Sequence, residues 1–221
     1  MNIFYLDKDP VIAAQMSADK HCVKMILESA QMLSTAHRFL DGDDIANEKG
    51  MYKMAHKNHP STIWTRSSVH NYMWLYVHMT ALMNEYTYRY GKHHATERLL
   101  EPLSKPPSSI PMVDFTSPPQ CMPDYCKGDD TVLAYQKYYI IEKSKIATWN
   151  KTRSAPKWWK DNIDGSKRGL LRLHIEKDMA GLTESHYNVL KHLKDVTQYN
   201  LELIKKIERL GGDPKQMEMD V

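Results

Sequence analysis

A chain of 221 residues with 42% hydrophobic and 26% charged residues has the composition of a globular protein large enough to bury a full core. It contains no run of about 18 apolar residues, and its start, NIFYLDKDP, lacks the basic end and long apolar centre of a signal peptide. These features argue against a membrane protein and predict an intracellular, cytoplasmic one. The formal net charge is +3, and the three cysteines, an odd number, are expected to be reduced thiols.

The first elements are predicted from capping residues and breakers. Residues 2–6 are an apolar, extended segment rich in strand formers. Asp9 can cap a short helix over residues 10–16. A long helix, free of proline and glycine, is expected to begin at Asp19 or two residues earlier and to end near the turn-forming residues 41–44.

The long helix has one apolar face and one polar line. Its apolar face consists of Val23, Ile26, Leu27, Ala30 and Leu33. The polar line, called here the polar stripe, consists of His21, Lys24, Glu28, Gln31 and Thr35. Residues beside the stripe are small or apolar, so the stripe should be partly buried. Buried charge is costly unless it is paired or used, which indicates either a catalytic site or a core network in which His21 or Lys24 neutralises Glu28.

A second long helix follows a less regular segment. Residues 45–66 show weak periodicity, and Pro60 is expected to break the chain there. Helical periodicity returns from Ser67 to Tyr90, with Gly91 as the natural C-cap. Aromatic and polar side chains are mixed on most faces of this helix, so it too should be largely enclosed.

Residues 101–130 form a segment that we call the proline-rich wrap. It holds seven of the eleven prolines, a density that neither a helix nor a central strand accommodates. A loop of this length within a domain is functional or disordered. Its apolar residues predict an ordered wrap that packs on the helices: Ile110, Met112, Val113, Phe115 and Met122.

A helix is expected from Thr131 to Trp149, followed by an irregular basic segment. Residues 137–172 contain ten Lys and Arg and three acidic residues, a local charge of +7, with aromatic residues interleaved: Tyr138, Tyr139, Trp149, Trp158 and Trp159. Basic residues attract phosphates, and exposed aromatic faces stack on unpaired bases. In the alternative interpretation, the tryptophans belong to the core and the lysines form a solvated face.

The chain ends with an amphipathic helix over residues 183–210. A single polar residue, Asn200, interrupts its apolar seam, as in paired coiled coils, so a homodimer through this helix is one hypothesis and packing on the chain's own core the favoured one. The predicted fold is therefore mainly α, with a single helical catalytic domain over residues 1–182, which includes the wrap at 101–130, and a C-terminal helix and tail over residues 183–221.

Several common chemistries lack their motifs here. Eleven histidines suggest a metal, yet there is no HExxH, no Glu-x-x-His pair in the long helices, no glycine-rich phosphate loop and no G-x-S-x-G. We therefore expect no metal and no cofactor. The remaining apparatus is Glu28 beside Lys24 and His21. A carboxylate near an amine can stabilise the positive charge that develops when a glycosidic bond breaks, and the amine can attack the sugar to form a Schiff base.

Four short motifs resemble one family. Asp19-x-His21-Cys22-Val23, with Glu28 nine positions after the aspartate, resembles the catalytic helix of the phage pyrimidine-dimer DNA glycosylases of the endonuclease V type. The start, M-N-I-F-Y-L-D, is similar to that of cellular members, and N-H-P at residues 58–60 has a counterpart in them. R-S-A-P-K-W-W at residues 153–159 is similar to the basic aromatic tail of the phage enzyme.

The resemblance implies an all-α enzyme, encoded by a phage or a bacterium, that binds duplex DNA at a damaged or modified base, bends it and displaces the base. Glu28 would be the catalytic carboxylate, shaped by His21 and Lys24, with the α-amine of Met1 or the amine of Lys24 as nucleophile. The nucleic-acid contacts implied are His59, Arg66, Lys151, Arg153, Lys157, Trp158 and Trp159.

One departure concerns the nucleophile. In the phage enzyme it is the α-amine of a small residue exposed when the initiator methionine is removed, whereas residue 2 here is Asn, a poor context for that removal. Alternatives are a monofunctional glycosylase, a transferase or glycosidase acting on nucleotides or modified bases, a non-catalytic nucleic-acid-binding protein, and a metal-dependent oxygenase or hydrolase built on the histidines.

Overall fold

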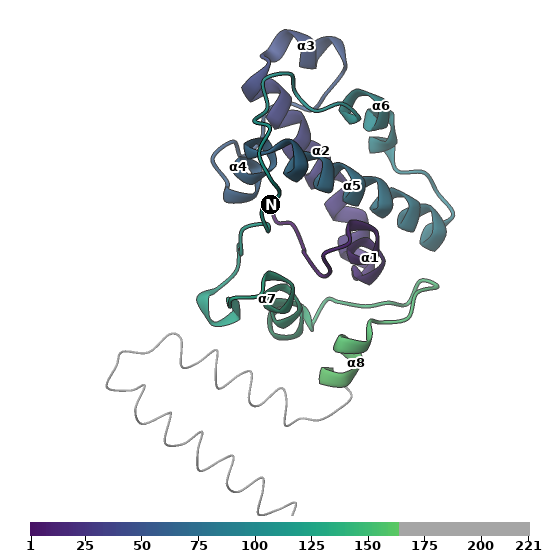
Figure 1. Ribbon diagram of the computed structural model, residues 1–221. Coiled ribbons are helices and arrows are strands. Elements are labelled where there is room, and N and C mark those ends of the chain that lie inside the picture. The colour runs from purple at the N-terminus through teal and green to yellow at the C-terminus, as the bar shows by residue number, and fades with distance from the viewer. Residues whose placement is uncertain (164–221) are drawn as a thin grey trace, which may run out of the picture. The chain divides into compact units, whose positions relative to one another are not determined.

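Two helices of 22 residues each, α2 (Asp19–Leu40) and α5 (Val69–Tyr90), pack against each other at the centre of the fold. Figure 1 shows the computed structural model, which describes residues 1–163. These residues belong to a unit that spans Met1–Asp164, and they contain helices and no strand. The mainly α prediction is thus confirmed for this part. The predicted boundary at 182/183, the C-terminal helix and its dimer seam lie outside the described residues.

Local capping explains where the first helices begin. α1 (Pro10–Met16) begins after Asp9, whose side chain accepts hydrogen bonds from the backbone N–H groups of Val11 and Ile12. α1 also packs against α5. α5 ends at Gly91, which has a left-handed φ of 63° that favours glycine. These predicted bounds are confirmed.

α2 is enclosed on more than its apolar face. The side beside the polar stripe is buried as well, through Cys22, Met25, Ser29, Met32 and Ala36. Leu27, which lies on the predicted apolar face, is 39% exposed, and Val23 on the same face is only half-buried. The buried arc of α2 is therefore turned toward α5 and away from Leu27.

Pro60 begins a helix where a break was predicted. α3 (Asp43–Glu48) follows α2, and an irregular segment leads to α4 (Pro60–Ser67), in which Pro60 occupies the first turn. Proline fits that position because the first turn of a helix leaves its N–H groups unpaired in any case. α4 packs against both α2 and α5.

The N-terminal residues 3–6 are extended and buried, but they pair with no strand within residues 1–163. Hydrogen bonds from side chains hold this segment instead. Asn2 donates to the carbonyl of Cys121 at 2.9 Å, and Gln136 donates to the carbonyl of Leu6 at 3.1 Å. The N-terminal segment therefore lies between α2 and the later part of the chain, and Asn2 is fixed in place.

The proline-rich wrap begins with the short helix α6 (Leu100–Leu103), which follows the 3₁₀ turn η1 (Ala95–Leu99). Near its end the wrap contains a second 3₁₀ turn, η2 (Asp124–Cys126). Asp41 accepts from the N–H groups of Ser108 and Ser109, and Asn71 exchanges hydrogen bonds with Thr116. These bonds tie the wrap to the ends of α2 and α5.

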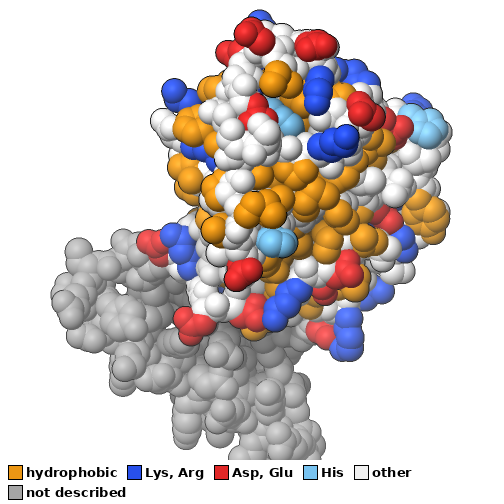
Figure 2. Space-filling model, turned by 45° about the horizontal axis from the view of Figure 1, so that its top comes forward, with side chains coloured by type: hydrophobic (Ala, Val, Ile, Leu, Met, Phe, Trp, Pro, Cys, Tyr) orange, Lys and Arg blue, Asp and Glu red, His pale blue; other side chains and the backbone are white. Residues whose placement is uncertain are grey.

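The packing predicted for the wrap is confirmed for Ile110 and for Phe115, whose partly exposed ring contacts those of Trp64 on α4 and Trp74 on α5, and it is wrong for Met112 and Val113. Ile110 is buried, whereas Met112 is 80% exposed and Val113 and Phe115 are exposed too. Figure 2 shows that apolar side chains gather over much of one face of the molecule. The wrap is thus held both by hydrogen bonds to its backbone and by the packing of Ile110 and Phe115.

The helix predicted from Thr131 to Trp149 is shorter than expected. α7 (Thr131–Tyr138) runs into a π-helical turn, η3 (Tyr139–Lys143), after which the chain is irregular up to α8 (Lys157–Ile163). Wider turns of this kind often occur at functional positions. Among the described helices, none is long and apolar enough to cross a membrane.

Candidate functional site

The polar stripe has two buried ends and an accessible middle. His21 is 7% exposed, and Thr35 is buried and bonded to the backbone of Ala55. Between them the side chain of Glu28 is 15% exposed and that of Lys24 is 72% exposed. Chemistry on a substrate is therefore restricted to the middle of the stripe.

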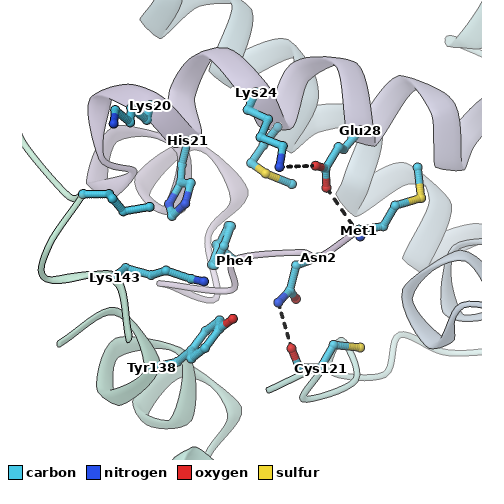
Figure 3. Close-up of a pocket in the computed structure, with 12 residues that line it drawn as sticks. Met1, Asn2, Phe4, Lys20, His21, Lys24, Glu28, Cys121, Tyr138 and Lys143 are labelled. Atoms are coloured by element: carbon cyan, nitrogen blue, oxygen red, sulfur yellow. Dashed lines mark hydrogen bonds and ion pairs between the residues drawn. The ribbon is translucent and has the colours of Figure 1, made fainter. Parts of the chain in front are cut away.

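A cavity of about 420 Å³ opens at this point, between α2, the N-terminal segment, the wrap and η3. Figure 3 shows how its residues surround the cavity, with Phe4 between the two sides. The residues that bring charge or a titratable group to it are Met1, Lys20, His21, Lys24, Glu28, Cys121, Tyr138 and Lys143. All four predicted catalytic residues, Glu28, Lys24, His21 and Met1, line this one cavity.

Two amines contact the carboxylate of Glu28. The α-nitrogen of Met1 lies 3.9 Å from Oε2, and the Nζ of Lys24 lies 3.2 Å from Oε1. The Met1 side chain is 3% exposed, and its sulfur lies 3.8 Å from the hydroxyl of Thr62 on α4. Met1 is thus held from both sides, and its amine is directed at Glu28 (Figure 3).

His21 is neutral at pH 7. Burial, helped by the charges of Lys143 and Lys24, lowers the pKa of its ring to about 4. The ring stacks on Phe4 at 4.2 Å, and its Nδ1 shares a hydrogen bond with the hydroxyl of Tyr139. His21 therefore shapes the wall of the cavity, and the neutralisation of Glu28 falls to Lys24 and the Met1 amine, not to His21.

His59 and Arg66, predicted to contact nucleic acid, both have partners in the protein. His59 caps α4 by accepting from the N–H of Ser61. Burial lowers its pKa, as do the charges of the Met1 amine and His56, although the charge of Glu28 opposes this. Arg66 donates to the carbonyl of Lys57, and its guanidinium covers the ring of Phe39 at 4.2 Å.

The basic aromatic segment makes many contacts within the fold, and its role in binding nucleic acid stays a prediction. Arg153 pairs with Glu85 through two hydrogen bonds of 3.0 and 2.6 Å. Trp159 is 8% exposed and packs on Trp149 with ring centres 4.8 Å apart. Trp158 is half-buried, and its indole N–H contacts the sulfur of Met16. Both tryptophans thus contribute ring contacts to the packing of the described fold.

Two lysines of this segment remain on the surface. Lys151 is exposed, and Lys157 is exposed and paired with Asp161 one turn later on α8. An exposed ion pair such as Lys157–Asp161 is weak. Both lysines can therefore attract phosphates at long range.

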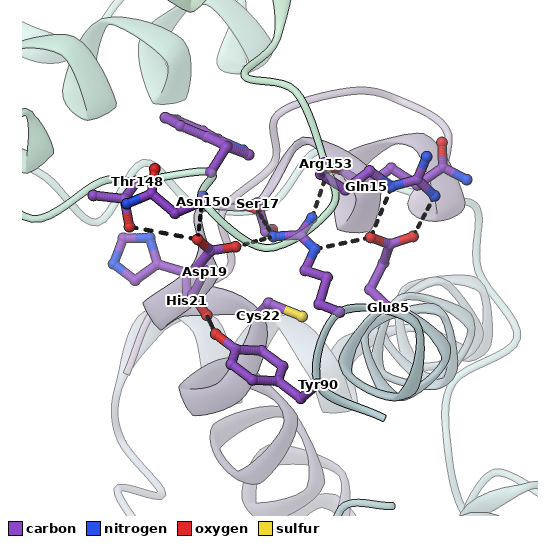
Figure 4. A network of polar contacts seen from close by, with 12 residues as sticks. Gln15, Ser17, Asp19, His21, Cys22, Glu85, Tyr90, Thr148, Asn150 and Arg153 are labelled. Atoms are coloured by element: carbon purple, nitrogen blue, oxygen red, sulfur yellow. Dashed lines mark hydrogen bonds and ion pairs between the residues drawn. The ribbon is translucent and has the colours of Figure 1, made fainter. Parts of the chain in front are cut away.

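Arg153 belongs to a group that we call the buried ion network: Asp19, Glu85, Arg89 and Arg153 (Figure 4). The side chain of Arg89 is 0% exposed, and it donates to both carboxylates and to the carbonyls of Gln15 and Ser17. Burial opposes ionisation of Glu85, but hydrogen bonds and charge from Arg153 and Arg89 outweigh it and lower its pKa. The network fixes the start of α2, and with it the cavity.

The prediction missed Lys20, Asn2, Cys121, Tyr138 and Lys143, which line the cavity as well. Lys20 lies one turn before Lys24 on α2, a spacing that could have revealed it. The others come from distant segments and left no signal in the periodicity.

Family models, curated proteins and solved structures were compared with the chain, and none of the three comparisons found a match. Within residues 1–163, no three His, Cys, Asp or Glu side chains are grouped so that they could hold a metal ion. The chemistry is therefore argued from the cavity itself.

Proposed function

We propose that this chain is a DNA glycosylase with lyase activity, which cleaves the N-glycosidic bond of a damaged or modified base in duplex DNA. The observation that carries the proposal is the α-nitrogen of Met1, 3.9 Å from the carboxylate of Glu28 at an accessible cavity. An amine and a carboxylate at this separation can act on the same sugar carbon.

The reaction divides between these two groups. The uncharged Met1 amine attacks C1′ of the deoxyribose, a C1′–N bond to the protein forms, and the bond to the base breaks, so that the base leaves with the electron pair and takes up a proton. Opening of the sugar ring gives an iminium ion, whose positive charge the Glu28 carboxylate stabilises. Loss of a proton from C2′ then expels the 3′ phosphate, which breaks the strand.

Asn2, the residue that departs from the phage pattern, supports Met1 as the nucleophile. Its side chain donates to the carbonyl of Cys121 at 2.9 Å and accepts from the hydroxyl of Tyr135 at 2.7 Å. It also accepts from the N–H of Ile3 at 2.9 Å. A residue held by three hydrogen bonds directly beside Met1 limits the motion of the α-amine, which favours attack in one orientation.

Borohydride trapping tests the proposal and identifies the amine. The full chain is incubated with an ultraviolet-irradiated duplex and with a duplex that contains an abasic site, then reduced, digested and analysed by mass spectrometry. We expect a covalent adduct on the peptide that contains the α-amine of Met1. The intact N-terminus is measured in the same experiment. No adduct and no strand cleavage with either duplex would reject the lyase.

The size of the cavity favours a second candidate, a glycosidase or transferase that acts on free nucleotides or modified bases. A volume of about 420 Å³ lies in the range of small-molecule sites. The same carboxylate chemistry at Glu28 would serve it. Turnover of mononucleotides together with indifference to duplex DNA would favour this second candidate over the first.

A further inference from the structure

The cavity has a second charged side, opposite Met1 and Glu28, formed by Lys20, Lys143 and Tyr138 (Figure 3). The π-helical turn η3 creates it. Tyr138 and Lys143 are five residues apart, so in an α-helix they would point about 140° away from each other. The wider turn brings them together, with the Nζ of Lys143 4.5 Å from the centre of the Tyr138 ring.

The charges of the cavity do not balance. Three lysines, Lys20, Lys24 and Lys143, line it beside the Met1 amine, and Glu28 is the one carboxylate among the lining residues. Glu28 already contacts Met1 and Lys24. No carboxylate among residues 1–163 forms an ion pair with Lys20 or Lys143. The neutral ring of His21 beside them adds no charge, so the second side attracts an anion.

We propose that Lys20 and Lys143 bind the phosphate ester of the sugar that meets Met1 and Glu28, so that the ligand of the cavity is a sugar phosphate. This inference rests on the proposed function for the sugar end of the cavity. An ammonium group is a point charge with three donors, which suits the oxygens of a phosphate. The phosphate can belong to a DNA strand or to a free nucleotide, and both present the same chemistry to the two lysines.

Salt-dependent binding tests the phosphate site without any catalytic step. The affinity of the full chain is measured at several salt concentrations for a duplex that contains a tetrahydrofuran residue, which carries both phosphates but no aldehyde. Lys20→Gln and Lys143→Gln should each reduce the slope of log affinity against log salt by about 0.9. Lys143→Arg keeps the charge and should keep the slope, which separates charge from folding. Lys49→Gln, an exposed position at the end of α3 that does not line the cavity, is the matched control.

The source of the phosphate is resolved by competition. Deoxyribose 5-phosphate and a nucleoside monophosphate are added to the complex of wild type, and of Lys143→Gln, with this duplex. If these compounds displace the duplex from wild type but not from Lys143→Gln, the result supports the phosphate site and assigns it to a free nucleotide. A lysine-dependent slope without displacement supports the site and assigns it to a DNA strand.

The phosphate site and the lyase fail in different ways. Slopes equal to wild type in both glutamine variants overturn the phosphate site, even where borohydride trapping succeeds. Lysine-dependent slopes without any trapped adduct retain the phosphate site and reject the lyase.

Discussion

The buried ion network matches two carboxylates with two arginines, whereas the cavity sets one carboxylate among several amines. In the network, Asp19 and Glu85 face Arg89 and Arg153, and backbone groups such as the carbonyl of Ser17 satisfy the remaining donors. In the cavity, Glu28 faces an excess of amines, and the site is open to solvent. Both groups involve α2, only a few turns apart.

This difference separates a structural role from a chemical one. A buried charge group that the protein completes by itself stabilises one arrangement of the chain, because removing a fully buried partner leaves a charge that is costly to bury. An accessible group with charge left over needs a partner from outside. Substitutions in the network should therefore change stability first, whereas substitutions in the cavity should change binding and chemistry first.

The largest expected effect is the loss of base release in Glu28→Gln. The amide keeps the shape of the side chain but cannot stabilise a positive charge, so the single-turnover rate should fall by about 10²–10⁴-fold. Affinity for the tetrahydrofuran duplex should persist. Glu48→Gln, an exposed carboxylate on α3, is the control and should retain the wild-type rate. A rate within threefold of wild type in Glu28→Gln would remove Glu28 from the mechanism.

The next effect concerns the network. Arg89→Met should lower the free energy of unfolding by about 3–5 kcal/mol, because Asp19 and Glu85 lose a fully buried partner. Arg153→Met should cost less, since the Arg153 side chain is 32% exposed and Glu85 keeps Arg89. Urea unfolding of both variants measures the difference. Equal losses would show that burial does not decide the contribution of each arginine.

A smaller effect concerns the pH dependence of stability that arises from buried histidines. Burial lowers the pKa of His78, in the core on α5, to about 4, although its hydrogen bond to the carbonyl of Pro10 opposes this. The unfolded chain binds a proton near pH 6.5, so stability is fully present above that pH and falls as the pH drops toward 4.

The slope in that window is up to about 1.4 kcal/mol per pH unit for each such histidine. His78→Asn, whose amide can still donate to Pro10, should reduce the slope by about one proton in urea unfolding between pH 7 and pH 5. A slope unchanged from wild type would mean that His78 is not the group that takes up the proton. His21 in the cavity should contribute with the same sign, because its pKa is lowered in the same way.

Local rules predicted the helices well because their signals are local. Asp9 and Gly91 mark helix ends by hydrogen bonding and by backbone conformation, and both act within a few residues. Glu28 and Lys24 could be placed together because they are four apart on one helix.

Contacts between distant segments were not predictable in this way. Arg153, predicted to contact nucleic acid, pairs with Glu85, 68 positions away, and no periodicity records such a pair. Lys143 reaches the cavity because η3 is wider than an α-helix, whereas the sequence predicted an α-helix through it. Trp159 was assigned to a surface by its basic neighbours, but its own area is buried against Trp149.

The smallest expected effect is on the stability of Lys24→Gln. The Lys24 side chain is 72% exposed, and exposed pairs four apart on a helix contribute about 0.3–0.5 kcal/mol, so the free energy of unfolding should change by no more than that. The Met1 amine still faces Glu28 in this variant, so the borohydride adduct should still form on the Met1 peptide. Disappearance of that adduct, with the stability unchanged, would transfer the nucleophile from Met1 to Lys24. Such a result would still separate the cavity from the buried ion network. Removal of the Lys24 charge would then alter chemistry without altering stability, as expected for the open cavity.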